Sequence, residues 1–150
     1  MERVLVSACL LGVACRYDGK SVGNDEIVEG LLKCAEIVPF CPEVYGGLTT
    51  PRNPAEIIDG RVISNAGKDV TDEYVRGAEG ALALCRRLGI RCALLKSRSP
   101  SCGKGTVYDG TFSGKLREGD GICAKMLSEN GINVFSSDNA QELFDFLIGR

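Results

Sequence analysis

Four short apolar runs alternate with amphipathic segments along the 150 residues of this chain, and this alternation constrains the fold most strongly. Apolar runs of this length, bounded by turn residues, predict strands that are buried in a sheet covered on both faces. The predicted strands are 3–7, 37–40, 90–95 and 132–135. Because helical patterns separate them, we predict one α/β domain over residues 1–150, with a doubly wound sheet of four mainly parallel strands.

The helices between these strands have end signals of their own. The longest predicted helix ends at Gly89, a residue that readily adopts the left-handed conformation found after helices. A shorter helix is predicted over 121–130. The predicted N-terminal caps of the other helices are Asn24, Thr71, and Asp138 with Gln141, a pair that resembles a capping box.

Two Asp-Gly dipeptides predict small β-hairpin insertions, because Asp-Gly favours the tight type I′ turn. Asp59-Gly60 lies between two short runs, 55–58 and 61–64. Asp109-Gly110 lies inside the segment 106–112, which we predict to form the second hairpin.

Three cysteines follow three of the predicted strands, each at the point where the strand ends. Cys9 follows the first strand, Cys41 the second, and Cys102 lies in the Ser- and Gly-rich loop after the third. Open α/β sheets bind their ligands just beyond the carboxyl ends of strands. We therefore expect these thiols to meet at a functional site. The remaining cysteines of the apolar segments are predicted core residues, namely Cys34, Cys85, Cys92 and Cys123.

The composition excludes several classes of function. The chain has no histidine, which excludes Ser-His-Asp and Cys-His catalysis and His-ligated zinc. A net charge of −2 without blocks of like charge gives no support for binding a nucleic acid polymer. No apolar run approaches the roughly 20 residues that cross a bilayer, and a core of this size needs no disulfides. We expect a cytoplasmic protein, monomeric, acting on a small molecule.

Several thiolates without histidine favour an iron–sulfur cluster or zinc. If only three cysteines bind, one metal position stays open for a substrate. Glu43 would then place a carboxylate beside the metal as the acid or base, and Ser99 or Ser101 could donate hydrogen bonds to a developing anion. Arg52 is expected to shape or charge the pocket and to bind the substrate. The loop cations Lys96, Arg98 and Lys104 are expected to make its surroundings positive.

The chain resembles the thiouracil desulfidase family at motifs that occur in the same order. These motifs are Ser7–Gly12, Cys15–Gly19, Cys41-Pro42-Glu43, Gly46-Gly47-Leu48, Pro51–Pro54 and Ser97–Gly103. The resemblance implies a [4Fe-4S] cluster held by Cys9, Cys41 and Cys102, whose fourth iron binds the sulfur of a thiolated substrate such as a thiouracil. It also implies that Glu43 relays protons and activates water, assisted by Ser99 or Ser101, with release of sulfide and no net redox change.

Two other functions fit parts of this pattern. One is a non-catalytic metal or cluster-binding module in which Cys15 completes a closed four-cysteine site. The other is a thiol enzyme with Cys102 as the nucleophile, activated by its basic loop. The lack of histidine makes the thiol enzyme the weakest of the three hypotheses.

Overall fold

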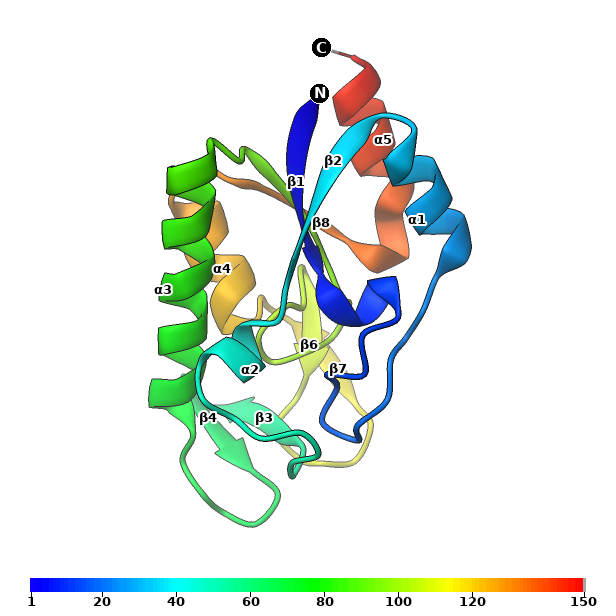
Figure 1. Cartoon of the computed structure of the whole chain (residues 1–150). Coiled ribbons are helices and arrows are strands. Elements are labelled where there is room, and N and C mark those ends of the chain that lie inside the picture. The colour runs from blue at the N-terminus through cyan, green and yellow to red at the C-terminus, as the bar shows by residue number, and fades with distance from the viewer. Residues whose placement is uncertain (150) are drawn as a thin grey trace.

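A parallel sheet of four strands in the order β2-β1-β5-β8 forms the centre of the molecule (Figure 1). The computed structural model describes residues 1–149. The strands are β1 (Glu2–Ser7), β2 (Ala35–Phe40), β5 (Cys92–Leu95) and β8 (Asn133–Ser136). The predicted doubly wound α/β fold is therefore confirmed.

Two pairs of helices cover the two faces of this sheet (Figure 1). They are α3 (Thr71–Leu88) with α4 (Ile122–Glu129) on one face, and α1 (Asp25–Leu32) with α5 (Ala140–Ile148) on the other. Successive side chains of β1 alternate between the two cores. Leu5 packs with residues of α3 and α4, while Val4 and Val6 pack with residues of α1 and α5. Both faces are thus buried, as the continuous apolar runs predicted.

The end signals of two helices act as predicted. The Asn24 side chain accepts a hydrogen bond from the Ile27 N–H at the start of α1. Gly89 ends α3 in the left-handed conformation, with φ of 68°.

Two predicted caps are wrong, and neither α3 nor α5 (Ala140–Ile148) has a side-chain cap at its start. The residue before α3 is Val70, and the Thr71 hydroxyl accepts a hydrogen bond from the Val62 N–H instead. Strand β4 (Arg61–Ser64) lies beside the helix start and supplies that donor. The Asp138–Gln141 capping box does not form. A short 3₁₀ helix, η2 (Ser137–Asn139), precedes α5, and the Ser136 side chain accepts from its Asp138 N–H.

The first hairpin has the predicted bounds, and the second is larger than predicted. Strand β3 (Ala55–Ile58) pairs with β4 in antiparallel register. Strand β6 (Thr106–Tyr108) pairs with β7 (Leu116–Glu118), so the chain does not turn back at Asp109-Gly110. The Asp109 side chain bonds locally to Thr111, and the Gly110 N–H bonds to Glu56 of β3. These contacts direct the loop 109–115 toward the first hairpin.

Two short helices that the sequence analysis did not predict follow β1 and β2. They are the 3₁₀ helix η1 (Ala8–Leu11) and α2 (Pro42–Tyr45), which begins with the proline that favours a first helical position. The α2 backbone contacts α3 directly at Gly77. A Cβ atom at Gly77 would lie 2.0 Å from the Pro42 carbonyl oxygen, so no side chain fits there. This contact fixes the turn that carries Cys41 and Glu43.

Among the helices of residues 1–149, none combines the length and apolar character that crossing a membrane requires.

Candidate active site

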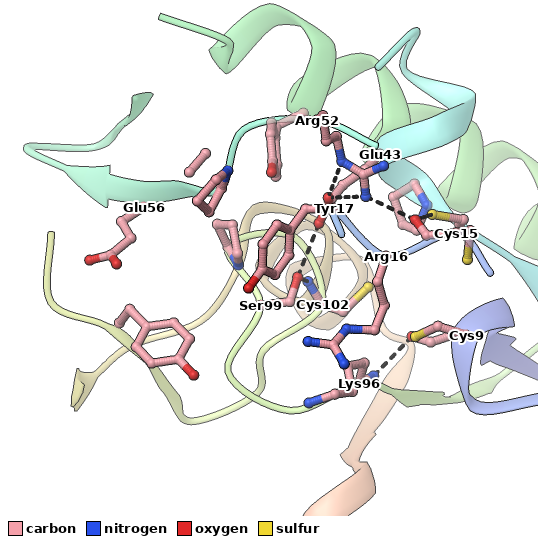
Figure 2. Close-up of a pocket in the computed structure, with 18 of the residues that line it drawn as sticks. Cys9, Cys15, Arg16, Tyr17, Glu43, Arg52, Glu56, Lys96, Ser99 and Cys102 are labelled. Carbon is pink, nitrogen blue, oxygen red and sulfur yellow. Dashed lines mark hydrogen bonds and ion pairs between the residues drawn. The ribbon is translucent and has the colours of Figure 1, made fainter. Parts of the chain in front are cut away.

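Cys9, Cys41 and Cys102 line a single cavity of about 440 Å³ at the carboxyl ends of three neighbouring strands (Figure 2). Cys9 lies in η1 after β1, Cys41 immediately precedes α2, and Cys102 lies in the loop after β5. The sheet changes winding direction between β1 and β5, which is where an open α/β sheet forms its ligand crevice. The predicted convergence of the three thiols is therefore confirmed.

Cys9 and Cys102 are buried, whereas Cys41 is only partly buried. Burial, together with the nearby Cys41 thiol, raises the pKa of Cys9, while the ammonium of Lys96 acts in the opposite direction (Figure 2). Burial raises the pKa of Cys102 more strongly. A neutral, enclosed thiol is a poor nucleophile, which argues against the thiol-enzyme hypothesis for Cys102.

The loop cations do not act together as the sequence suggested. Arg98 pairs with Asp138 at 3.7 Å, and Lys104 pairs with Asp120 at 3.2 Å. Lys96 alone of these three lines the cavity, where Arg16 also lies.

Cys15 lies beside Cys41 on the same cavity wall. The Cys41 thiol contacts the Cys15 carbonyl oxygen at an Sγ–O distance of 3.9 Å. Burial and the neighbouring Cys41 raise the pKa of Cys15 to about 12. Four thiols, rather than three, therefore line the cavity. By contrast, Cys34 is only partly buried and lies outside the cavity lining, whereas Cys85, Cys92 and Cys123 are buried in the core as predicted.

Glu43 projects from α2 into the cavity with both carboxylate oxygens engaged (Figure 2). Its Oε2 accepts hydrogen bonds from Arg52, at 2.6 Å from Nη2 and 3.0 Å from Nε. Its Oε1 accepts from the Ser99 hydroxyl at 3.2 Å. The carboxylate is thus held in one orientation, with Oε1 on the side of the serine.

Arg52 lines the cavity, but its N–H groups all have partners within the described residues. Besides its two bonds to Glu43, it donates to the carbonyl of Cys15, the carbonyl of Thr49 and the hydroxyl of Thr50. A guanidinium has five N–H groups, and these five bonds use all of them within the described residues. The structure therefore makes Arg52 a support for Glu43.

The two candidate serines have different surroundings. The Ser99 oxygen accepts the N–H groups of Ser101 and Cys102, each at 3.0 Å, so its own proton is directed to Glu43. The structure does not bring Ser101 to the cavity. Its side chain is fully buried, and its Oγ has no hydrogen-bond partner within residues 1–149.

Several cavity residues were missed by the sequence analysis. Tyr74 of α3 lies at the cavity wall, where burial and the nearby Glu43 raise its pKa. Tyr17 and Arg16 belong to the Cys15–Gly19 motif, so their position in that motif was a usable signal. Glu56 and Phe112 come from the two hairpins, and no sequence signal connected them with the cysteines.

The donor set fits an iron–sulfur cluster better than a single metal ion. Within residues 1–149, no three side chains of the metal-binding types are arranged to hold one ion. A four-iron cluster has different requirements, because each cysteine binds its own iron and the thiols surround the cluster. Cys9, Cys41 and Cys102 line one cavity, so three thiols can each bind an iron of one cluster, and Cys15 lies beside them. The nearby carboxylate of Glu43 is already held by Arg52.

Comparison with known proteins gives the same result. A family model described as 2-thiouracil desulfurase matches residues 4–139. The solved structure of a "[4Fe-4S]-dependent thiouracil desulfidase TudS" is 48% identical, with a TM-score of 0.90 and coverage of 100% of both chains. The uncharacterized protein YbbK of Bacillus subtilis (strain 168) is 39% identical over 150 residues, covering 93% of this chain and 99% of that protein. The chain therefore belongs to the 2-thiouracil desulfurase family.

Proposed function

We propose that this protein is a [4Fe-4S]-dependent desulfidase that converts the thiocarbonyl group of a thiouracil, or of a related thiolated nucleobase, into a carbonyl group and releases sulfide. The observation that carries this proposal is the shared cavity, which brings three cysteine thiols together with the Glu43–Ser99 pair. The chain's family supports the same reaction.

Cys9, Cys41 and Cys102 would hold the cluster as thiolates. When bound, the cluster supplies a soft iron without a protein ligand, which attracts the sulfur of a thiocarbonyl group. The protein supplies the surroundings of that group. Cys9 and Cys102 are buried, and Glu43 and Ser99 line the same cavity.

Glu43 would act as the general base through Oε1. Arg52 occupies Oε2 with two hydrogen bonds, so Oε1 is the oxygen that can accept a proton from water. The water oxygen bonds to the thiocarbonyl carbon, the carbon–sulfur bond breaks, and sulfur leaves as sulfide. The protons of the water leave with the sulfide, Glu43 passing on the one it accepted. No electrons are gained or lost.

Ser99 would orient Glu43 by keeping its hydroxyl hydrogen bond to Oε1, without giving up its proton. Two backbone N–H groups fix the serine oxygen, so its hydroxyl has one favourable direction, toward Oε1. We assign the serine role to Ser99 on this ground.

The state of the cysteines bears on the cellular compartment of the protein. All eight cysteines are free thiols in the structure, which supports a reducing compartment, and we propose the cytoplasm. We further propose one domain that acts as a monomer on a small thiolated molecule and not on a nucleic acid polymer.

The closed-site module remains the second candidate because Cys15 lies beside Cys41. In that module Cys15 would be a fourth ligand, and the protein would bind a metal or cluster without consuming a substrate.

The experiment is to reconstitute the cluster anaerobically and to measure bound iron and sulfide release from 2-thiouracil. The serine variants of Cys9, Cys41 and Cys102 should each lose both iron and turnover. Cys34→Ser, outside the cavity, is the matched control and should retain both. Glu43→Gln should keep the iron and lose at least about 100-fold in kcat, as expected for a general base. Iron binding without any sulfide release by the wild type would favour the closed-site module.

A further inference from the structure

The end of the cavity away from the cysteines is formed by the two hairpins. Its lining there includes Glu56 of β3 and, from the β6–β7 hairpin, Tyr108, Phe112 and Gly114. Figure 2 shows Glu56 across the cavity from Cys9 and Cys15. A substrate whose thiocarbonyl lies near Glu43 would extend its remaining atoms toward this end.

Glu56 fastens the loop 109–115 to the first hairpin. Its Oε1 accepts the N–H of Gly110 at 2.9 Å and the N–H of Phe112 at 3.2 Å. The residue is buried, and a buried carboxylate binds such donors strongly. The loop is closed at its base by the bond from the Asp109 N–H to the Lys115 carbonyl. The backbone of Phe112 is therefore held by the Glu56 side chain, which belongs to the other hairpin.

Phe112 has an unusual backbone and an unusual exposure. Its φ is 54°, in the left-handed region that bulky side chains rarely adopt. The residue is 38% exposed and lines the cavity, although the chain contains only five phenylalanines with which to fill its cores. Strained residues of this kind occur at ligand sites, where the surrounding contacts enforce them. The hydrogen bonds that Glu56 accepts from Gly110 and Phe112 hold Phe112 in this conformation.

Tyr17 is the other exposed aromatic residue of the cavity. The residue is 41% exposed, and Figure 2 shows it in the middle of the pocket, near Arg52 and Arg16. Its backbone carbonyl accepts a hydrogen bond from the backbone N–H of Arg52 at 2.7 Å. The tyrosine is thereby tied to the residue that holds Glu43, so a ring bound against Tyr17 has a defined place relative to the carboxylate.

We propose that Phe112 and Tyr17 contact the planar ring of the substrate and determine which thiolated heterocycles are accepted, and that Glu56 is a positioning residue that holds Phe112. Aromatic faces bind planar heterocycles by stacking, with little dependence on their substituents. The substrate's chemical class comes from the proposed function, whereas the binding surface comes from the loop geometry.

The test measures both turnover and binding, so that the two proposals can fail separately. The probes are 2-thiouracil, for KM and kcat of sulfide release, and uracil, for calorimetric binding to the reconstituted protein. Phe112→Ala should raise KM and the Kd of uracil about tenfold, the size of one lost stacking contact, with kcat within about twofold. Leu116→Ala, an exposed residue of the same hairpin outside the cavity lining, is the matched control and should change neither.

Glu56 is tested by rescue and by a double variant. Glu56→Ala should raise KM and Kd as Phe112→Ala does, and Glu56→Gln should restore most of the loss, because an amide oxygen still accepts both N–H groups. In the Phe112→Ala background, Glu56→Ala should add less than about twofold, since it acts through the same ring. Full additivity would overturn its positioning role.

Unchanged KM and Kd in Phe112→Ala, with sulfide release intact, would overturn this inference and leave the proposed function standing. Uracil binding that weakens in Phe112→Ala and Glu56→Ala, in a protein that releases no sulfide, would support this inference and overturn the proposed function.

Discussion

The guanidinium of Arg52 lies 2.6 Å from the carboxylate of Glu43, and the two side chains are only 8% and 13% exposed. An ion pair so nearly enclosed has lost most of its hydration, so each partner depends on the other for its stability. The pair lies at the cavity where the three strand-end cysteines meet. Glu43 is therefore held in place by a residue whose own hydrogen bonds are all made to the protein.

Replacing Arg52 should affect both stability and catalysis. Arg52→Ala leaves the Glu43 carboxylate enclosed without its partner, so the free energy of unfolding should fall by about 3 kcal/mol or more. Arg52→Lys keeps the charge but not the five-donor geometry, and it should lower kcat with little change in KM. Urea denaturation and sulfide-release kinetics measure these effects. Arg61→Lys, at an exposed ion pair, is the control and should change the stability by less than about 1 kcal/mol.

The two loop serines should differ sharply. Ser99→Ala removes the donor to Glu43 and the acceptor of two N–H groups, so kcat should fall about tenfold or more, with the iron content retained. Ser101→Ala removes a buried oxygen without a partner in the described structure, and should leave both kcat and stability nearly unchanged. Equal losses in the two variants would contradict the assigned role of Ser99.

Cys15 distinguishes an open from a closed site. If three cysteines hold the cluster, Cys15→Ser should retain the iron and sulfide release, although its position beside Cys41 predicts a faster loss of iron in air. Iron analysis before and after aerobic exposure measures this. Loss of the iron from Cys15→Ser under anaerobic conditions would instead make Cys15 a ligand.

Asp69 should give the protein an acid-dependent part of its stability. Hydrogen bonds from Thr71, and then the Arg61 guanidinium, lower the pKa of the Asp69 carboxyl to about 2. Since this pKa is lower in the folded than in the unfolded chain, the stabilisation is present above the unfolded pKa and is lost as the pH falls toward 2. The difference in urea midpoint between wild type and Asp69→Asn should therefore be largest at neutral pH and should shrink between about pH 5 and 2.

The parts of the fold that follow from local patterns could be predicted from the sequence. The apolar runs located the four strands, and the cysteines that follow them located the site, because parallel strands end at a common edge. The caps at Thr71 and Asp138 could not be predicted. Their alternative partners, Val62 and Ser136, are supplied by tertiary contacts and a preceding turn.

The roles within the site were harder to predict than its place. Arg52 looked available for a substrate, since nothing in the sequence shows that five acceptors surround it. Ser99 and Ser101 are equivalent as sequence signals, and only the path of the loop separates them. The hairpin loop that brings Phe112 to the cavity depends on Glu56, a residue more than 50 positions earlier in the chain.

The contact between α2 and α3 has a consequence for how this site can change in evolution. At Gly77 the helix backbone meets the Pro42 carbonyl without room for one methyl group, and Gly46 meets the Glu73 carbonyl equally closely. Neither position carries a functional group, yet only glycine fits at each of them. The placement of Cys41 and Glu43 thus depends on the absence of a side chain at two glycines, and one added carbon at Gly77 would displace both residues together.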